Sequence, residues 1–556
     1  MTWCFDCKAD QTGDYLLLCK ELDHDIDADR MFQITNQETK PAHTKDESQE
    51  NVVEKLAKFA PSQMEKVVIS QGDNNKIYAM VKINGHLETM EVDKKNQKIV
   101  YWLQIVYYEN FGQWYSEESC ANAIGFLRAK ISMNENTNRE KTHIRTAFVN
   151  DEIYYDLGSP DWKIVKITKD SVNIVDFSKQ IPVFFRSGKT AQQATPCFMP
   201  EGNALDDFAK LCRMPNAELF KVHLIANLIS DIPTPIMAIQ GAAGASKSTV
   251  SSMIKRVVDP AGNSLEDNLK SVPHGEDNFV TSLVNTYCQV FENISHIDQD
   301  TSNMMCRAIT GGSFDKRAQY TNGDVFTMSF KRKILINGID FVINYADLAD
   351  RTIVYELERV TDEARKTDCF IENSFCKLLP NLLGQIFLVL QKVLQTVKKI
   401  EKATEKTPRM ASFAVYGEAI YQVLGHKQGE FLEIYKHALT KNLEILYDAN
   451  PIIPFLDNLL QDKDKCEMQS KDLFRKLKSF VGIEGYNDKH LPQSPSGIRS
   501  WILKSKSLLD EHNYKVSHYK NTKSKSTSGF TPNAMIYTTS RITQKQTQLK
   551  ENELDL

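Results

Sequence analysis

Residues 241–249, GAAGASKST, combine small side chains with one lysine and three hydroxyl groups. They follow a short apolar stretch, PIMAIQ at 235–240, and precede a stretch with a helical pattern, KSTVSSMIKRVV at 247–258. A strand, a bare turn and a helix that begins at a lysine suit phosphate, because backbone amides can close on the anion. The pattern therefore predicts a site for the phosphates of a nucleotide.

Each position of this loop has an expected role in binding ATP. Lys247 would reach the β- and γ-phosphates, and the Ser248 hydroxyl would bind Mg²⁺, with Thr249 as a less favoured substitute. Ser246 stands where the usual pattern has glycine, and its Cβ crowds the turn. A strand, turn and helix that bind no ligand remain the alternative. The backbone that would surround the phosphates belongs to Gly241, Ala242, Ala243, Gly244, Ala245 and Ser246.

Three polar residues downstream could complete a hydrolytic site. Glu292 ends an apolar strand at 287–291, which is where an acid that holds Mg²⁺ and its water is expected. Asn337 ends another predicted strand and could orient water beside the γ-phosphate. Arg351 precedes a third strand, where an arginine can reach a neighbouring subunit's nucleotide. The alternatives are a solvated acid for Glu292 and a salt bridge at a helix end for Arg351.

Basic residues flank a predicted β-hairpin between 314 and 333. Asn322 and Gly323 give the turn signal. Cations that track phosphate, with aromatic rings for bases, are typical of binding to single strands. A hairpin with a solvated basic face is the alternative. The predicted DNA contacts are Lys316, Arg317, Tyr320, Lys331, Arg332 and Lys333.

The C-terminal part is also basic. Residues 462–550 hold 17 Lys and Arg against 8 Asp and Glu, a net +9. Two helical patterns, 470–482 and 496–513, precede a two-stranded wing, which is the order of a winged helix. The second helix would present Arg499, Lys504 and Lys506 to DNA.

Composition limits the remaining function classes. The formal charge of the whole chain is −4, so any nucleic-acid binding must come from local patches. The apolar stretch at 378–400 is interrupted by polar residues and predicts a buried helix, so we expect a cytoplasmic protein with no membrane partner. Cysteines without a framework spacing suit a reducing compartment. A zinc site is a minor alternative to scattered thiols, with Cys4, Cys7, Cys19 and His24 as its ligands.

The elements predict a multidomain α/β protein. Short β-branched or aromatic segments predict strands at 66–70, 77–83, 152–158, 162–168, 171–176 and 181–186, with a helix at 118–133 among them. The predicted parts are a head and polar linker (1–64), a β-rich accessory domain (65–200), a P-loop ATPase core (201–360), a helical region (361–449), a winged helix (450–540) and a tail (541–556).

The order of GAAGASKST, VFENIS, the hairpin segment and LADR resembles the superfamily 3 helicase module, a branch of the AAA+ ATPases. The likeness is closest to the primase-associated ATPases of phages, plasmids and archaeal mobile elements. It covers about residues 200–360, and weaker likenesses extend to both sides. The resemblance implies a hexameric ring with ATP at subunit interfaces and single-stranded or forked DNA in a central channel. It assigns Walker A to Gly241, Gly244, Lys247 and Ser248, Walker B to Glu292, the sensor to Asn337 and the arginine to Arg351.

Two departures from the family pattern bear on mechanism. Ser246 replaces the usual glycine, and Glu292 is followed by Asn293 where many AAA+ proteins carry a second acid. Glu292 would then both position Mg²⁺ and activate water, or Asp298 or a neighbour would assist. The leading expectation is an ATP-dependent DNA helicase or translocase in the replication of a mobile element. A regulatory ATPase that does not unwind DNA and the helicase subunit of a primase-helicase are the alternatives, and any priming would fall to a separate primase.

Overall fold

The computed structural model describes residues 51–71, 75–262, 268–317, 325–329, 331–339, 345–403, 408–449, 451–461, 463–484, 491–522, 530–531 and 534–541. The chain divides into two compact units, 1–55 and 56–556, and the second, which begins within the helix at 52–59, contains the other described elements. It is a mixed α/β, multidomain structure. The four candidate zinc ligands lie outside the described residues, as do Tyr320 and the hairpin turn.

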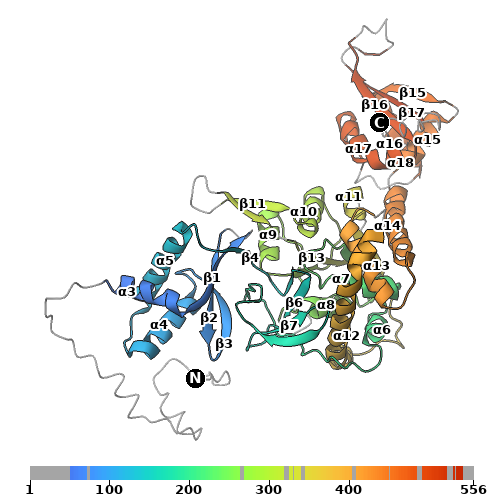
Figure 1. Cartoon of the computed structure of the whole chain (residues 1–556). Helices are drawn as coiled ribbons and strands as arrows, with labels where there is room; N and C mark the ends of the chain where they lie inside the picture. Colours follow the sequence, from blue (N-terminus) through green and yellow to red (C-terminus); the bar gives the residue numbers. More distant parts are fainter. Residues whose placement is uncertain are drawn as a thin grey trace. The chain divides into compact units, whose positions relative to one another are not determined.

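The first part of this unit is a small α/β layer (Figure 1). Its sheet has the order β3-β2-β1-β4, in which β1 pairs antiparallel with β2 and parallel with β4. The helix predicted at 118–133 is present as α5, but a second helix, α4, occupies a stretch for which no helix was predicted. The elements are α3 (Val52–Phe59), β1 (Met64–Gln71), β2 (Ile77–Ile83), β3 (His86–Glu91), α4 (Gln97–Phe111), α5 (Glu117–Met133) and β4 (Arg139–Lys141).

Helix α4 forms despite its aromatic and β-branched residues because both of its ends are capped. The Asn96 side chain accepts a hydrogen bond from the Lys98 amide, and Gly112 ends the helix with φ of +64°. Its inner face buries Ile99, Trp102 and Leu103. Tertiary burial of one face therefore overrides the local strand preference.

A second, antiparallel sheet follows, with the order β5-β6-β7-β8. The strand predicted at 181–186 is absent, and this segment makes only an isolated bridge between Phe184 and His143. One side of the sheet shares a core with Val68 and Tyr78 of the first sheet, while the other side joins the large core of the following part. The strands are β5 (Thr146–Val149), β6 (Glu152–Asp156), β7 (Lys163–Ile167) and β8 (Val172–Asp176).

The centre of the unit is a four-stranded sheet, β10-β13-β9-β14, in which all neighbours are parallel. Its strands are short and almost fully buried, as parallel strands covered by helices are. The elements are α6 (Ala204–Leu211), α7 (Ala217–Ala226), β9 (Ile236–Gln240), α8 (Lys247–Val258), α9 (Glu276–Val284), β10 (Cys288–Phe291), α10 (Gln299–Thr310), β11 (Ser313–Arg317), β12 (Val325–Ser329), β13 (Lys333–Gly338), α11 (Ala346–Ala349) and β14 (Thr352–Glu356).

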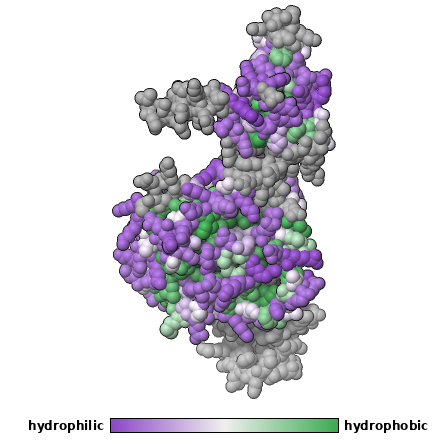
Figure 2. Space-filling view, turned by 90° about the vertical axis from the view of Figure 1, so that its right-hand side faces the viewer, coloured by the Kyte–Doolittle hydropathy of each residue, from purple (hydrophilic) through white to green (hydrophobic). Residues whose placement is uncertain are grey.

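Three long helices come next: α12 (Asp368–Ala403), α13 (Ala411–Val423) and α14 (Glu430–Ala449). Within the described residues, α12 is the one helix that is long and apolar enough to cross a membrane, and half of its most apolar window is buried inside the protein. Leu383, Ile386 and Phe387 of α12 belong to the large core. On the face drawn in Figure 2, hydrophilic residues predominate and hydrophobic ones form small separate patches.

The C-terminal part has its own core, which includes Phe455, Leu477 and Trp501. It contains a three-stranded sheet with the order β15-β17-β16. Along the chain its elements follow the order helix, strand, three helices, two strands. The helix predicted at 496–513 is divided into α17 and α18. The elements are α15 (Ile452–Leu460), β15 (Lys465–Gln469), α16 (Ser470–Glu484), α17 (Ile498–Lys504), α18 (Lys506–Glu511), β16 (Tyr514–Lys520) and β17 (Met535–Arg541).

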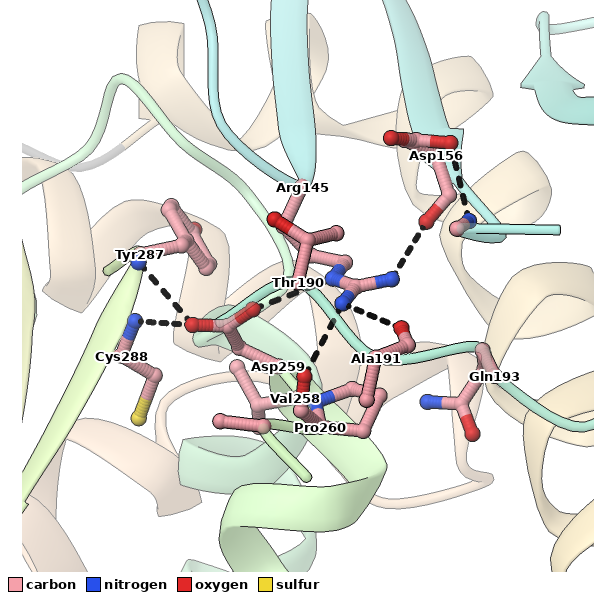
Figure 3. A network of polar contacts seen from close by, with 12 residues as sticks. Arg145, Asp156, Thr190, Ala191, Gln193, Val258, Asp259, Pro260, Tyr287 and Cys288 are labelled. Atoms are coloured by element: carbon pink, nitrogen blue, oxygen red, sulfur yellow. Dashed lines mark hydrogen bonds and ion pairs between the residues drawn. The ribbon is translucent and has the colours of Figure 1, made fainter. Parts of the chain in front are cut away.

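A buried ionic network joins the second sheet to helix α8 and strand β10 (Figure 3). Arg145, which is 1% exposed, donates through Nε to Asp259 at 3.0 Å and through its other nitrogens to the carbonyls of Asp156, Ala191 and Pro260. Asp259 stands at the C-terminal end of α8. A fully buried guanidinium is costly unless its donors are satisfied, and here four bonds satisfy it.

The second oxygen of Asp259 completes this network. It accepts hydrogen bonds from the amides of Tyr287 and Cys288 at 2.9 and 3.0 Å, and it forms an ion pair with Lys255 at 3.0 Å. Burial alone would raise the pKa of Asp259, but Lys255, Arg145 and the Cys288 amide together lower it to about 2. The carboxylate thus fixes the end of α8 to the start of β10.

Candidate functional site

The loop 241–246 leaves the carboxyl end of β9, the inner strand next to β14 and β13. Ala242, Ala243 and Gly244 are exposed. Gly241 is required by close approach, since a Cβ there would lie 2.3 Å from the Leu357 carbonyl oxygen. The small residues expected from the sequence therefore leave an open backbone loop at the edge of a parallel sheet, where ligands of α/β proteins bind.

Helix α8 begins directly after this loop. Its N-cap, Ser246, has φ of +61° and ψ of +28°, the left-handed conformation that disfavours a Cβ. This is the physical reason why glycine is usual here. The Lys247 ammonium lies over the loop and donates to the carbonyls of Gly241 at 2.6 Å and Ala242 at 2.9 Å. Ser248 and Thr249 are half-buried on the first turn.

Strand register brings Glu292 and Asn337 to the same edge of the sheet as the loop. Gln240 pairs with Gly338, and Phe291 pairs with Ile336, so the carboxyl ends of the three strands are level. Glu292 is half-buried, and its amide donates to the Lys270 carbonyl at 2.8 Å. The predicted convergence of these elements is therefore present in the backbone.

Asn337 is fully buried and uses both ends of its amide within the protein. Nδ2 donates to Oγ of Ser251 on α8 at 3.0 Å, and Oδ1 accepts from the Asn293 amide at 3.0 Å. The expectation that its side chain contacts water beside a phosphate is not met by this geometry. Asn337 instead positions the helix that carries Lys247 and the residue that follows Glu292.

Asp298, the candidate helper acid, is engaged elsewhere. Its side chain caps α10 by accepting from the Thr301 amide at 2.7 Å, and these hydrogen bonds lower the pKa of its carboxyl. Within the part of the chain that the structure describes, no group of three His, Cys, Asp or Glu side chains forms a metal cluster. Ser248 and Glu292 supply the hydroxyl and carboxylate oxygens that Mg²⁺ prefers, so these residues fit the predicted ion.

Arg351 lies at the opposite edge of the sheet. Its carbonyl accepts from the amide of Ile236, the first residue of β9, while the loop follows Gln240 at the other end of that strand. Five strand residues span about 16 Å. Arg351 is mostly buried, forms an ion pair with Asp347 and donates to the Asp347 carbonyl at 2.9 Å. Arg409 shares Asp347 and reaches Asp350 at 3.2 Å.

Three other arginines surround the loop in the same chain, and the sequence reasoning missed them. Arg213 donates to the Ala245 carbonyl at 2.9 Å. A Cβ built on Gly244 would lie 3.6 Å from Nη2 of Arg365 and 4.0 Å from Nε of Arg359. Arg359 and Arg365 belong to the segment ERVTDEARK after β14, which carries three basic and three acidic residues and so shows no local excess of positive charge. These cations give the loop a positive surrounding that suits phosphate.

The hairpin forms as predicted, but its basic residues divide into two groups. Lys316 and Arg317 lie on β11, which pairs antiparallel with β12. Lys331 donates to the Asp231 carbonyl, Arg332 to the Leu283 carbonyl at 2.8 Å, and Lys333 to the Ile232 carbonyl at 2.8 Å.

Lys333 is 1% exposed, and burial, followed by repulsion from Lys331, lowers its pKa to about 7. The prediction that Lys333 contacts DNA is therefore wrong: its amine is enclosed where β13 begins. Burial also lowers the pKa of Lys331. Lys331 and Arg332 anchor the base of the hairpin through their side chains, which corrects their expected position on an open basic face. In the C-terminal part, Arg499 and Lys506 are exposed on α17 and α18, and Lys504 is the last residue of α17.

The comparisons with known proteins give one match to a family model and two similar structures. Residues 205–440 match the model described as actinomycete integrative conjugative element replication protein. No curated protein gives a significant match. The structure titled "SCCmec type IV Cch - active helicase" has 12% identity and a TM-score of 0.40, covering 86% of this chain and 94% of that chain.

A second similar structure is titled "The A form apo structure of NrS-1 C terminal region-CTR". It has 12% identity and a TM-score of 0.36, covering 88% of this chain and 98% of that chain. The stretch that matches the replication-protein model contains the loop 241–249, Glu292, Asn337 and Arg351.

Proposed function

We propose that this chain hydrolyses ATP at the loop 241–249 and uses the reaction to move along or unwind DNA during replication of a mobile genetic element. One observation carries the proposal: the open loop, Glu292 and Asn337 meet at one edge of a parallel sheet, and Asn337 joins them through Ser251. The match of residues 205–440 to a conjugative-element replication family supports the biological setting.

In this proposal the loop amides and the Lys247 ammonium hold the phosphates of ATP. Lys247 exchanges its bonds to the carbonyls of Gly241 and Ala242 for bonds to phosphate oxygens. Mg²⁺ held by Ser248 and Glu292 would neutralise charge that develops on the phosphates. Glu292 is the acid that accepts the proton of the attacking water, since Asp298 is occupied as a helix cap. Arg359 and Arg365 add positive charge from the same chain.

The position of Arg351 favours action between subunits. Because it lies at the far edge of its own sheet, about 16 Å from its own loop, it can serve only a loop on another subunit. To do so it must leave Asp347, and Arg409 remains to pair with that acid. We therefore propose a ring, hexameric as the family resemblance implies, with DNA gripped by Lys316 and Arg317 and by the winged helix at 450–540.

The test is ATP hydrolysis by Lys247→Ala beside a matched control, Lys210→Ala, whose ammonium is exposed on α6 and forms only a surface pair with Asp207. We expect Lys247→Ala to lose hydrolysis, while its thermal unfolding and that of the control stay within a few degrees of wild type. Hydrolysis within twofold of wild type in Lys247→Ala would remove the nucleotide site. Hydrolysis without any DNA-dependent activity would favour the regulatory ATPase.

A further inference from the structure

A cavity of about 650 Å³ lies where the first sheet meets the second. This volume is within the range of pockets that bind small molecules. Its lining comes from β2, β3, the start of α4, the turn before β7, the segment 185–188 after β8 and the end of α9, and it does not include the loop 241–249. The residues that matter for its chemistry are Tyr78, Thr89, Trp162, Phe185 and Arg186.

One wall of the cavity is planar and aromatic. The rings of Tyr78 and Phe185 stack with centroids 5.6 Å apart and an interplanar angle of 27°. The Arg186 guanidinium lies 3.9 Å from the centroid of the Trp162 ring. Trp162 has φ of +53°, an unusual and costly conformation for a bulky side chain. Strain of this kind persists where the surrounding structure needs a side chain in one place.

The charged residues of the lining are already paired, either with one another or, for Arg186, with Asp156 outside the lining. Lys98 contacts Glu88 at 2.5 Å, and Lys76 contacts Glu91 at 3.4 Å. Arg186 is held by both oxygens of Asp156, at 2.9 and 2.6 Å. Among these described residues no cation is left over to neutralise a phosphate, so the part of a ligand that enters the cavity is uncharged. The ion-paired side chains can still donate and accept hydrogen bonds with the atoms that do not take part in the ion pairs.

One polar atom of the lining has no partner. The Thr89 hydroxyl is buried, with the residue 8% exposed, and it makes no hydrogen bond to any group that the structure describes. A buried hydroxyl without a partner is costly, so such atoms usually mark a missing partner. Thr89 lines the cavity although its hydroxyl oxygen is enclosed in this structure, so a neutral ligand with a hydrogen-bonding edge would bond to it after a rotation about χ1.

We propose that this cavity binds the base of an unpaired nucleotide in a DNA strand. A base is planar, neutral and edged with donors and acceptors, which matches the aromatic wall, the paired charges and the Thr89 hydroxyl. Stacking on aromatic rings and on arginine planes is the common way to hold unpaired bases. The DNA source of the base rests on the proposed function, whereas a free nucleoside has the same chemistry and tests the cavity apart from it.

The experiment uses the full chain and a single-stranded oligonucleotide that carries one 5-iodouracil, with cross-linked residues mapped by mass spectrometry. We expect cross-links at Phe185 or Trp162. Thr89→Val keeps the shape and removes the hydroxyl, so it should weaken binding of the oligonucleotide about fivefold. Phe185→Leu should weaken binding roughly tenfold by removing the stacking surface. Thr396→Val, a threonine of α12 that bonds to its own helix, is the matched control and should change nothing.

A parallel arm titrates thymidine, and ATP hydrolysis without DNA is measured for every variant. Unchanged affinity in Thr89→Val and cross-links elsewhere would overturn the proposal. Binding of thymidine that depends on Thr89, without any cross-link from the oligonucleotide, would also overturn it and assign the cavity to a free nucleoside. Thr89→Val should keep wild-type hydrolysis, so this result and a failure of Lys247→Ala to lose hydrolysis are independent of each other.

Discussion

The side-chain nitrogen Nδ2 of Asn337 donates a hydrogen bond to the hydroxyl oxygen of Ser251 at 3.0 Å. This bond joins the end of β13 to the second turn of α8. Because α8 begins at Lys247, this bond transmits any shift of the strand end to the lysine. The other end of the Asn337 amide holds the backbone after Glu292. One side chain thus sets the spacing between the two halves of the proposed site.

We expect Ser251→Ala to lower kcat for ATP several-fold with a small loss of stability. The change leaves the buried Asn337 Nδ2 without an acceptor, at a cost of about 1–3 kcal/mol that falls on the link between β13 and α8. The measurements are steady-state hydrolysis and thermal unfolding. Ser374→Ala, which removes a hydroxyl bonded to its own helix on α12, is the control. Equal kinetics in both variants would assign Asn337 a purely structural role.

Ser246→Gly should raise the free energy of unfolding by up to about 1 kcal/mol, because the left-handed conformation at φ +61° penalises a Cβ. Ser246→Val should lower it, since a β-branched side chain suffers more there. Chemical denaturation of the three proteins measures the order. If glycine is no more stable than serine, the strain at this N-cap is compensated by contacts of the Ser246 side chain.

Mixing two inactive variants distinguishes Arg351, at the amino end of the parallel strands, from Arg359, which lies beside the loop at their carboxyl end. Arg351→Ala mixed with Lys247→Ala should recover some hydrolysis, because an intact Arg351 from one subunit meets an intact loop on another. Arg359→Ala mixed with Lys247→Ala should recover none, because Arg359 lies beside the loop of its own chain. Equal recovery in both mixtures would contradict the proposal that Arg351 acts on another subunit and Arg359 on its own.

The two groups of basic residues in the hairpin should differ in their effect on the salt dependence of DNA binding. Lys316→Gln combined with Arg317→Gln should flatten the log–log slope by about 0.7 per lost phosphate contact on a single strand. Lys333→Met should leave the slope unchanged, since its amine is enclosed and bonds to the Ile232 carbonyl. Salt titrations with two unrelated oligonucleotides check this, and equal slopes in all three proteins would remove β11 from the DNA contact.

Acid should destabilise the protein below about pH 6.5 through His223. Burial lowers its pKa to about 3 from the ordinary 6.5, so the unfolded chain binds a proton that the folded chain does not. The free energy of unfolding is therefore highest above pH 6.5 and falls as the pH drops towards 3. Asp259, whose pKa is about 2, adds a further loss between about pH 4 and 2.

His223→Gln tests the upper part of this range. Glutamine can donate to the Pro235 carbonyl and accept from the Tyr355 hydroxyl, as the ring nitrogens do at 3.0 and 3.2 Å. We expect the variant to lose about half of the slope of unfolding free energy between pH 6 and 4, because His143, whose pKa burial lowers to about 4, contributes the rest. A slope equal to that of wild type would place the titrating group elsewhere.

The sequence predicted the loop, the strand ends and the hairpin because each has a local signal. Glu292 follows the apolar strand β10, Asn337 lies near the end of β13, and Lys247 follows the loop after β9, and parallel strand ends meet by geometry. Local pattern could not tell Lys316 from Lys333, because the enclosure of Lys333 depends on the carbonyl of Ile232, 101 residues away. For the same reason Arg359 and Arg365 were missed, since their closeness to Gly244 arises from the turn after β14.

Arg145 and Asp259 are 114 residues apart, and Asp259 is the acid that the buried guanidinium bonds directly, while Lys255 holds the other oxygen of that acid. Genetic exchange between related genes would be filtered at this pair. A crossover anywhere between the two codons joins the residue at 145 from one parent to the residue at 259 from another, and an arginine without its acid leaves a buried guanidinium unpaired, at about 3–5 kcal/mol. Residues 145–259 would therefore be inherited as one block, across the boundary near 200 that the sequence pattern suggests.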